Sequence, residues 1–493
     1  MRPDSETVFS PFFVIQYQLY TVTLIMPKSV IPAKLVLAKA GSGNPGKHWI
    51  PGQARNDELP EIYVVMYIST GAIFLTSSAT LFMIFLNPNR PGIPGPQTKG
   101  SSRITVEDVK ECSFQSDLEG ISQVPFLPGN SVQVLKDGLA AFQEFFQAVE
   151  KAERLICLEF YIFRDDETGW ALGELLARKS LAGVRVYLIY DHFGSYSTSA
   201  KFWRFLESHR IILYPFHPPR WRNLNLYFHR DHRKLAIIDG RVFFTGGFNV
   251  GDEYRGYLRR KLKGWRDTGV KGIGPVAAGM LEAFKESWQE CGGREMEENP
   301  ETRKTDPEQD QGVKMLPLLS STRKSMQILR RLLQFSLYSA RQRIHLTMAY
   351  FIPSRKFLMS LIRAARKGVD VKIILPGQSD LRLISYVSRT YYQTLLAGGV
   401  KIFHYQPRVL HAKTMVFDGE WTIVGSANLD ARSFNYNYEC GVGILDRGLG
   451  ETMEEMFRQD LLDSNPVTQE DLRRWPFHER ALGTFFSRFR SYL

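Results

Sequence analysis

The chain contains 493 residues, more than one typical domain, and this length predicts roughly two to four domains. Hydrophobic residues make up 44% of it, enough for a sizeable core, and its formal net charge of +12 favours anionic partners such as phospholipid surfaces, nucleic acid or phosphorylated substrates. None of the four cysteines forms a Cys-x-x-Cys pair, which argues against a disulfide framework or a cysteine-rich zinc site.

The N-terminal region carries a membrane signal. We interpret residues 1–61 as a leader of uncertain structure, and residues 62–86 carry no formal charge. A helix of that length, rising about 1.5 Å per residue, could cross a bilayer core of roughly 30 Å. The sequence therefore predicts a transmembrane helix over 62–86, with a buried core helix as the alternative. Basic residues after this run mildly favour a cytoplasmic location for the rest of the chain.

Helix and strand patterns alternate after a predicted linker over 87–127, whose first part is rich in proline and glycine. A helix is expected over 137–152, a strand over 154–163, a helix over 168–183 and a strand over 184–191. This order predicts an α/β fold, and we place a first domain at 128–291.

The same order recurs later in the chain. A strand pattern begins at Arg343, a helix pattern covers 358–368, and a second strand covers 369–377. We therefore predict a charged, solvated connector over 292–312 and a second domain over 313–462. The remaining segment, 463–493, is a basic tail.

The internal repeat is clearest in one stretch of each half. HRKLAIIDGRVFFTGGFN, which begins at His232, matches HAKTMVFDGEWTIVGSAN, which begins at His411. The residues shared at fixed offsets are His232, Lys234, Asp239, Gly240, Gly246 and Asn249 in the first copy, and His411, Lys413, Asp418, Gly419, Gly425 and Asn428 in the second. Two fused copies of one domain, related by a pseudo-twofold axis, are the expected origin of this pattern.

Each copy places three kinds of polar group together. Histidine and lysine two residues apart share one face of a strand, a two-residue Asp-Gly turn follows, and the returning strand brings an asparagine to the same end. Two imidazoles, two ammonium groups and two amides suit a phosphodiester. One histidine can attack phosphorus while the other protonates the leaving oxygen, without a metal or another cofactor.

The acidic residues have two expected roles. Asp239 and Asp418 complete the repeated His-Lys-Asp set and count among the candidate catalytic residues, although their place at the hairpin favours stabilising the turn. Asp267 and Glu439 occupy matching positions further on. We predict that Asp267 orients His232 and that Glu439 orients His411, with Glu253 as the rival carboxylate in the first half.

Two simpler interpretations compete with catalysis. A single histidine on a strand is more often structural than catalytic, but the duplication of the whole set favours catalysis. His229 and His232 could suggest zinc, yet no cysteine or His-Glu-x-x-His pattern accompanies them, so no metal site is predicted.

The repeated motif resembles the signature of the phospholipase D superfamily. Stretches such as GGFNVGDEY at Gly246, GWRDTGV at Gly264, AYFIP at Ala349 and GSANLDARSFNYNYE at Gly425 are similar to bacterial-type cardiolipin synthases. The resemblance extends from about Pro128 to the C-terminus. It implies two fused phospholipase D-like domains, each a mixed β-sheet flanked by helices, with one active site at their interface.

This resemblance also implies a reaction. His232 would be the nucleophile, His411 the general acid and then base, and Lys234, Lys413, Asn249 and Asn428 would bind the phosphate. One phosphatidylglycerol would give its phosphatidyl group to another, releasing glycerol, at the inner membrane of a bacterium. A hydrolytic phospholipase D and a phosphatidylserine synthase remain alternatives, and a nuclease is a more distant one because the hydrophobic run argues against nucleic acid.

The C-terminal tail mixes arginines with Trp475 and four phenylalanines from Arg473 onward. Such a segment is typical of an amphipathic helix at an anionic membrane surface. The alternative is that the tail packs on the catalytic domains.

Overall fold

The computed structural model describes residues 114–219, 228–256, 264–296 and 312–493 in full, together with the backbone of five short strands between residues 15 and 85. The chain divides into two compact units, Met1–Thr105 and Val106–Leu493. The predicted connector over 292–312 lies mostly outside the described residues.

The first unit contains short strands where a helix was predicted. Its strands are β1 (Ile15–Tyr17), β2 (Tyr20–Ile25), β3 (Ile62–Tyr67), β4 (Ala72–Ser77) and β5 (Thr80–Phe85). The last three fall within the predicted transmembrane helix, so the described structure differs from that prediction. The run is rich in β-branched and aromatic residues and is interrupted by Ser, Thr and Gly, which favours strands joined by turns. No helix among the described residues is long and apolar enough to span a bilayer.

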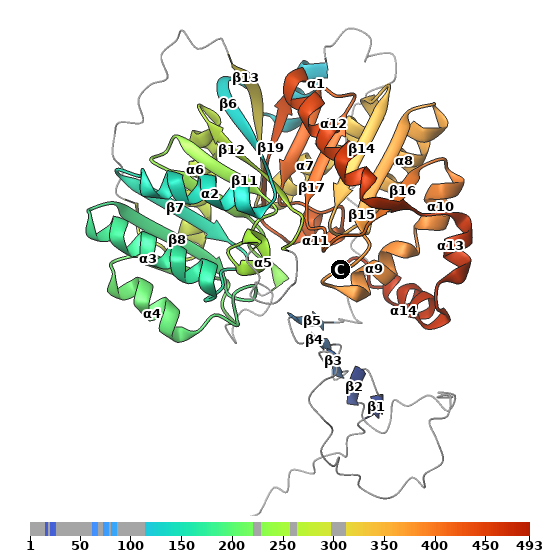
Figure 1. Cartoon of the computed structure of the whole chain (residues 1–493), viewed down its shortest axis with the longest axis horizontal. Coiled ribbons are helices and arrows are strands. Elements are labelled where there is room, and N and C mark those ends of the chain that lie inside the picture. The colour runs from blue at the N-terminus through green and yellow to red at the C-terminus, as the bar shows by residue number, and fades with distance from the viewer. Residues whose placement is uncertain are drawn as a thin grey trace, which may run out of the picture. The chain divides into compact units, whose positions relative to one another are not determined.

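The second unit is organised around one mixed sheet of 15 strands (Figure 1). The first half of the unit supplies β6 (Leu127–Lys136), β7 (Leu155–Phe160), β8 (Arg185–Asp191), β9 (Ile212–Phe216), β10 (Lys234–Ile238), β11 (Val242–Gly246) and β12 (Thr268–Ile273). The second half supplies β13 (Val313–Ser320), β14 (Arg343–Met348), β15 (Asp370–Pro376), β16 (Lys401–Tyr405), β17 (Lys413–Phe417), β18 (Trp421–Gly425), β19 (Glu439–Leu445) and β20 (Ser464–Pro466).

The strand order repeats on both sides of the sheet centre. From β6 outward the order is β6-β12-β11-β10-β7-β8-β9, and from β13 outward it is β13-β19-β18-β17-β14-β15-β16, with β20 added at that edge. β6 and β13 pair antiparallel and join the two halves. The predicted α/β class, with a mixed sheet and flanking helices in each half, is confirmed.

Helices cover both faces of this sheet (Figure 1). In the first half they are α1 (Phe114–Ser122), α2 (Gly138–Glu150), α3 (Glu167–Leu181), α4 (Ala200–Ser208), α5 (Asp252–Arg255) and α6 (Val276–Glu290). In the second half they are α7 (Arg323–Ser339), α8 (Arg355–Arg366), α9 (Arg382–Arg389), α10 (Tyr392–Ala397), α11 (Ala431–Asn435), α12 (Arg447–Leu462), α13 (Gln469–Arg474) and α14 (Phe477–Ser487). Side-chain caps fix several of their starts, for example Asp166 at α3 and Thr322 at α7.

Strand β10 shows how the sheet is buried on both faces. Leu235 and Ile237 belong to an apolar core with α6, whereas Ala236 and Ile238 face a second core with α2 and α3. The core with α6 also contains side chains of β17, β18, β19 and α12, such as Val442. The two halves therefore share a core, which explains why residues 106–493 form one compact unit.

Three predicted boundaries differ from the structure. The predicted linker over 87–127 contains α1, whose Leu118 is fully buried and whose Phe114 stacks on Phe335 of α7. The hairpin connections are three residues long, 239–241 and 418–420, because β10 and β11 pair Ile238 with Val242 and the second hairpin follows the same register. Each connection is one residue longer than predicted.

The tail packs on the second half, which was the alternative to the favoured prediction of an interfacial helix. Arg389 of α9 forms an ion pair with Glu479 of α14 and stacks over Trp475. Phe486 is 6% exposed, whereas Phe477 is 78% exposed. The tail thus buries one side against α9 and leaves other apolar side chains at the surface.

Candidate active site

The repeated histidine and lysine lie at the same place in each half. His232 precedes β10 and Lys234 is its first residue, while His411 precedes β17 and Lys413 begins it. Each lysine Nζ donates to the backbone carbonyl of its own histidine, at 2.7 Å for Lys234. All four side chains are buried, with exposures of 8% or less. Buried ammonium groups are costly unless they serve an anion or are paired, which marks this region as a candidate binding site.

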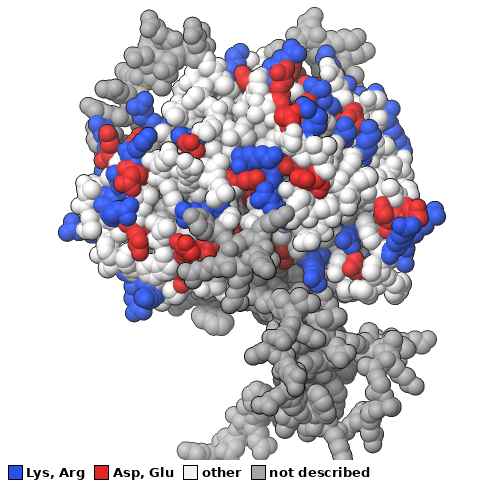
Figure 2. All heavy atoms as spheres, viewed as in Figure 1, with Lys and Arg blue, Asp and Glu red and all other residues white. Residues whose placement is uncertain are grey.

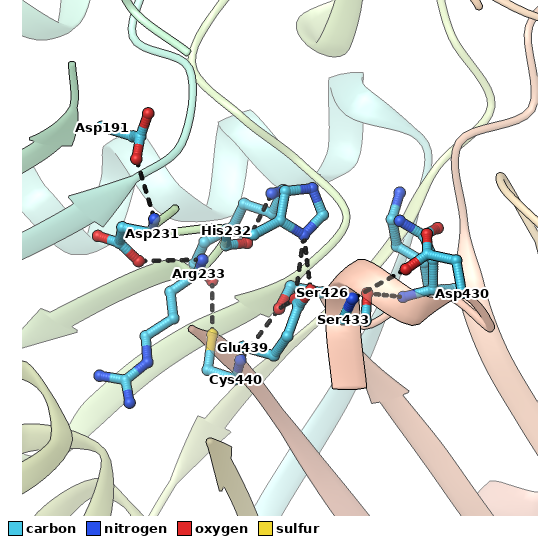
Figure 3. Close-up of polar contacts among 12 residues, drawn as sticks. Asp191, Asp231, His232, Arg233, Ser426, Asp430, Ser433, Glu439 and Cys440 are labelled. Carbon is cyan, nitrogen blue, oxygen red and sulfur yellow. Dashed lines mark hydrogen bonds and ion pairs between the residues drawn. The ribbon is translucent and has the colours of Figure 1, made fainter. Parts of the chain in front are cut away.

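Each histidine pairs with a carboxylate from the other half, and Figure 3 shows the pair of His232 and Glu439. The Nδ1 atom of His232 lies 3.0 Å from Glu439 Oε2, and the Nδ1 atom of His411 lies 2.8 Å from Asp267 Oδ2. The predicted pairs, Asp267 with His232 and Glu439 with His411, are therefore wrong, and the partners are exchanged. Glu253 is not a partner either, because it pairs with Arg164 at 3.0 Å.

The exchange follows from how the backbone crosses between the halves. The His232 N–H donates to the carbonyl of Tyr438 at 3.0 Å, and the His411 N–H donates to the carbonyl of Arg266 at 2.8 Å. Each histidine segment therefore runs beside the segment that precedes β19 or β12 of the opposite half. The carboxylate one residue further along is then the one within reach.

The two carboxylates are held differently. Ser426 Oγ donates to Glu439 and also accepts from the Cys440 N–H at 3.0 Å (Figure 3). Gly247 occupies the matching position in the first half, and a Cβ atom there would lie 2.0 Å from Asp267 Oδ1. Asp267 therefore needs glycine at position 247 to avoid a clash, whereas Glu439 is held by a hydrogen bond from Ser426.

Burial and charge set the protonation of the histidines. Burial, reinforced by Lys234 and Lys413 and opposed by Glu439, lowers the pKa of His232 to about 4. Burial and Lys413 also lower the pKa of His411, against the effect of Asp267. The pKa of Glu439 stays below its ordinary value despite its burial, because His232 and Lys234 stabilise the carboxylate. A carboxylate only accepts hydrogen bonds, so His232 carries its proton on Nδ1 and leaves the Nε2 lone pair available.

The lysines repel one another across the halves. Burial lowers the pKa of Lys234 to about 7, and Lys413 adds to this effect although Glu439 opposes it. Burial lowers the pKa of Lys413 to about 8. Two buried cations this close are stabilised by an anion placed between them, which is the charge that a phosphodiester carries.

The repeated asparagines follow β11 and β18 and are also buried. Asn249 Oδ1 accepts from the Ile162 N–H at 3.0 Å and its side chain also forms a hydrogen bond with Tyr254, which leaves one amide N–H that can donate to a ligand. The Asn428 N–H donates to Ser433 Oγ at 3.1 Å, and its Oδ1 has no partner among the described residues.

The repeated aspartates lie at the other end of their strands. Asp239 accepts from the backbone N–H groups of residues 153–155 at 2.8 to 3.0 Å, and Asp418 accepts from those of residues 341–343 at 2.8 to 2.9 Å. Both have positive φ values, 51° and 55°. Including them among the candidate catalytic residues is therefore not supported by the geometry, because they bind the start of the neighbouring strand and do not contact the histidines.

Comparison with known proteins identifies the family. A family model described as the PLD-like domain of cardiolipin synthase matches residues 334–461. Cardiolipin synthase A of Pseudomonas putida (strain GB-1) is 35% identical over 354 residues, which cover 72% of this chain and 73% of the relative. The chain belongs to the cardiolipin synthase family. Cardiolipin synthase A of Pseudomonas entomophila (strain L48) is 34% identical over the same shares of the two chains. The predicted resemblance is confirmed.

A solved structure supports the fold of this cardiolipin synthase family member. Phosphatidylserine synthase of Haemophilus influenzae Rd KW20 matches with a TM-score of 0.58, at 14% identity, over 77% of this chain and 100% of that chain. At this identity the match supports the shared fold alone.

Sequence reasoning missed several aromatic side chains around the histidines. The Tyr161 ring lies 5.1 Å from the His232 ring, while Tyr254 and Trp265 lie 5.5 Å and 5.4 Å from His411. Tyr350 lies 6.2 Å from His411, and its hydroxyl donates to Asp380 at 2.6 Å. The spacing of the repeated motif gave no signal for these residues, because Tyr254 belongs to α5 and the others to loops outside the motif.

The charges on the described part of one face do not mark a second site. Lys, Arg, Asp and Glu are interspersed over the described part of the face in Figure 2, so the excess positive charge does not gather there into one basic patch. The fully described ranges also contain no group of three or more His, Cys, Asp or Glu side chains arranged to hold a metal ion.

Proposed function

We propose that this chain is a cardiolipin synthase that transfers a phosphatidyl group from one phosphatidylglycerol to a second and releases glycerol. Its family membership and the names of its relatives support this function. The observation that carries the mechanism is the pair of buried histidine–carboxylate contacts, each built from both halves, beside two buried lysines.

The first step forms a phosphohistidine on His232. Its Nε2 attacks phosphorus, the phosphorus–oxygen bond to glycerol breaks, and His411 gives a proton to the departing glycerol oxygen. The low pKa of His232 keeps it neutral and nucleophilic near pH 7, and Glu439 stabilises the positive charge that develops on its ring. The negative charge of the bound phosphodiester raises the pKa of His411 and so opposes the lowering of that pKa by Lys413.

The second step transfers the phosphatidyl group to lipid. A hydroxyl of the second phosphatidylglycerol gives its proton to His411, and its oxygen bonds to phosphorus. The phosphorus–nitrogen bond breaks, and its electron pair returns to Nε2 of His232. Asp267 orients His411 in both steps and stabilises its protonated form.

The other repeated residues bind the phosphate. Lys234 and Lys413 neutralise its charge, and the amides of Asn249 and Asn428 donate to its non-bridging oxygens. Asp239 and Asp418 act through the fold, by fixing the hairpin loops. The matching strand orders support a pseudo-twofold relation between the halves, with the phosphate near that axis.

The substrates place the reaction at a membrane. We include in the proposal that residues 62–86 anchor the chain to the inner membrane of a bacterium, with the catalytic unit on the cytoplasmic side. Exposed apolar side chains of the tail, such as Phe477, would contact anionic lipid beside arginines.

Labelled phosphatidylglycerol supplied to membranes that contain the full chain tests the function. Cardiolipin together with free glycerol is expected. Phosphatidic acid alone would indicate hydrolysis, and phosphatidylserine formed after addition of free serine would indicate that serine is the acceptor. The His232→Asn variant should lose both the product and an acid-labile phosphorylated protein; label that persists on this variant would refute His232 as the nucleophile.

A further inference from the structure

One difference between the surroundings of the two histidines is a pair of side chains, Tyr350 and Asp380. Next to His411, the Tyr350 hydroxyl donates to Asp380 Oδ2 at 2.6 Å. Asp380 lies in the loop between β15 and α9, which can be followed in Figure 1, and its side chain is exposed. Its charge raises the pKa of both His411 and Lys413, which places it within electrostatic range of the reacting groups.

The first half lacks this pair. The strand registers place Ile162 where the second half has Tyr350, because Phe160 faces Lys234 as Met348 faces Lys413. Counted from the paired strand starts, Arg185 of β8 and Asp370 of β15, the position of Asp380 is taken in the first half by Ser195, which is 3% exposed. Ser195 Oγ donates to the Tyr161 carbonyl at 3.2 Å and accepts from the Phe163 N–H at 3.0 Å. It is therefore fully used within the fold.

In-line displacement at phosphorus makes the side of His411 the side on which both alcohols bind. The nucleophile and the leaving oxygen lie on opposite sides of phosphorus, so glycerol leaves on the side of His411. The hydroxyl that attacks the phosphohistidine must approach from the same side. Both alcohols are glycerol groups, and each carries at least one further hydroxyl group that needs an acceptor once water is displaced.

We propose that Asp380, held by Tyr350, binds the free hydroxyl groups of the glycerol headgroup and thereby selects a polyol over water as the phosphatidyl acceptor. This inference rests on the proposed function. The carboxylate has two oxygens, of which Oδ2 accepts from Tyr350 and Oδ1 has only a 3.4 Å contact with Ser379. The Asp380 side chain is exposed, and its carboxylate can accept further hydrogen bonds from a ligand.

Headgroup exchange measures this role directly. Labelled glycerol that attacks the phosphohistidine regenerates labelled phosphatidylglycerol, while water that attacks it gives phosphatidic acid. For Asp380→Asn, we expect the KM for glycerol to rise about 10-fold or more, since the amide loses a charge-assisted acceptor. The rate of phosphatidic acid formation should change less than about 3-fold, because water does not need the subsite. The ratio of cardiolipin to phosphatidic acid should fall accordingly.

Two further variants sharpen the test. Tyr350→Phe keeps the ring beside His411 but removes the hydroxyl, and it should shift the KM for glycerol in the same direction by a smaller factor. Asp463→Asn is the matched control, because Asp463 is an exposed residue at the C-terminal end of α12 and no hydrogen bond or ion pair joins its carboxylate to the described histidines. It should behave as the wild type.

The outcomes separate this inference from the proposed function. If the wild type forms neither cardiolipin nor labelled phosphatidylglycerol, the proposed function fails. If the wild type forms both and Asp380→Asn lowers transfer and hydrolysis by the same factor, Asp380 acts only through the charge of His411 and the inference is overturned. Unchanged transfer in Asp380→Asn would overturn it equally.

Discussion

Replacement of Glu439 by Gln should slow the formation of the phosphohistidine. The Glu439 carboxylate is fully buried and lies 3.0 to 3.1 Å from His232 Nδ1, so this is a charge-assisted hydrogen bond without solvent competition. Loss of such a bond costs about 1.5 to 3 kcal/mol, and more of it is lost as positive charge develops on the ring. We therefore expect the first step to slow by about 10- to 100-fold. Ser426 remains available to hold the amide in place.

An activated substrate distinguishes the two carboxylates. In a p-nitrophenyl phosphodiester, p-nitrophenolate leaves without taking up a proton. The first turnover of this substrate therefore needs His232 but no general acid. With this substrate, rapid-quench measurement of labelled protein should show a reduced burst for Glu439→Gln and a nearly normal burst for Asp267→Asn. With phosphatidylglycerol, both variants should be slow.

The reverse pattern would refute the reasoning. If Asp267→Asn abolished the burst with the activated substrate and Glu439→Gln did not, either the carboxylates would be paired within each half or His411 would be the nucleophile. Glu174→Gln is a suitable control, since Glu174 is an exposed residue of α3. Circular dichroism of all three variants excludes unfolding as the cause.

Three more predictions follow from the geometry of the same site. Asp239→Ala removes the acceptor of three backbone N–H groups, and it places alanine, which has no side-chain hydrogen bond to stabilise this backbone, at a φ of 51°. The free energy of unfolding should therefore fall by about 2 to 4 kcal/mol, while the protein that remains folded keeps its turnover rate. Gly247→Ala should push Asp267 away from its histidine and reduce turnover with a smaller change in thermal unfolding, whereas equal turnover would mean that the loop adapts. Because burial lowers the pKa values of Lys234 and Lys413 to about 7 and about 8, both lysines lose protons as pH rises through this range, and inhibition by sulfate should weaken about 10-fold or more between about pH 7 and 9.

Much of the second unit follows from the sequence because its signals are local. Alternating helix and strand patterns placed α2, β7, α3 and β8, and the same patterns placed β14, α8 and β15. The spacing of His232 and Lys234 puts both at the same strand end, since strand geometry has a period of two. The repeat then predicted that His411 and Lys413 occupy the equivalent position in the second half.

The exchanged carboxylates could not be predicted in this way. The repeat gives Asp267 and Glu439 equivalent positions, and pairing within a half or across the halves satisfies that equivalence equally well. The choice depends on how the segment before β10 runs beside the segment before β19, which is a contact between residues more than 200 positions apart. No periodicity or propensity carries that information.

Other differences arise where a local pattern has two solutions. The uncharged run over 62–86 is long enough for a helix, but its β-branched and aromatic residues also favour strands, and short strands are what the described backbone contains. The tail is amphipathic, but its apolar side had two candidate partners, lipid and protein. The ion pair between Arg389 and Glu479 and the burial of Phe486 show that α9 takes one side of it.

The asymmetry of the site explains how two similar halves can have different tasks. A duplicated histidine–lysine set does not by itself determine which histidine attacks phosphorus. The surroundings differ: His232 meets a glutamate held by Ser426, whereas His411 meets an aspartate beside Gly247. Beside His411, Tyr350 holds the exposed carboxylate of Asp380, which can accept hydrogen bonds from hydroxyl groups. The alcohol is therefore expected to bind beside His411, which leaves the opposite face of the phosphorus to His232.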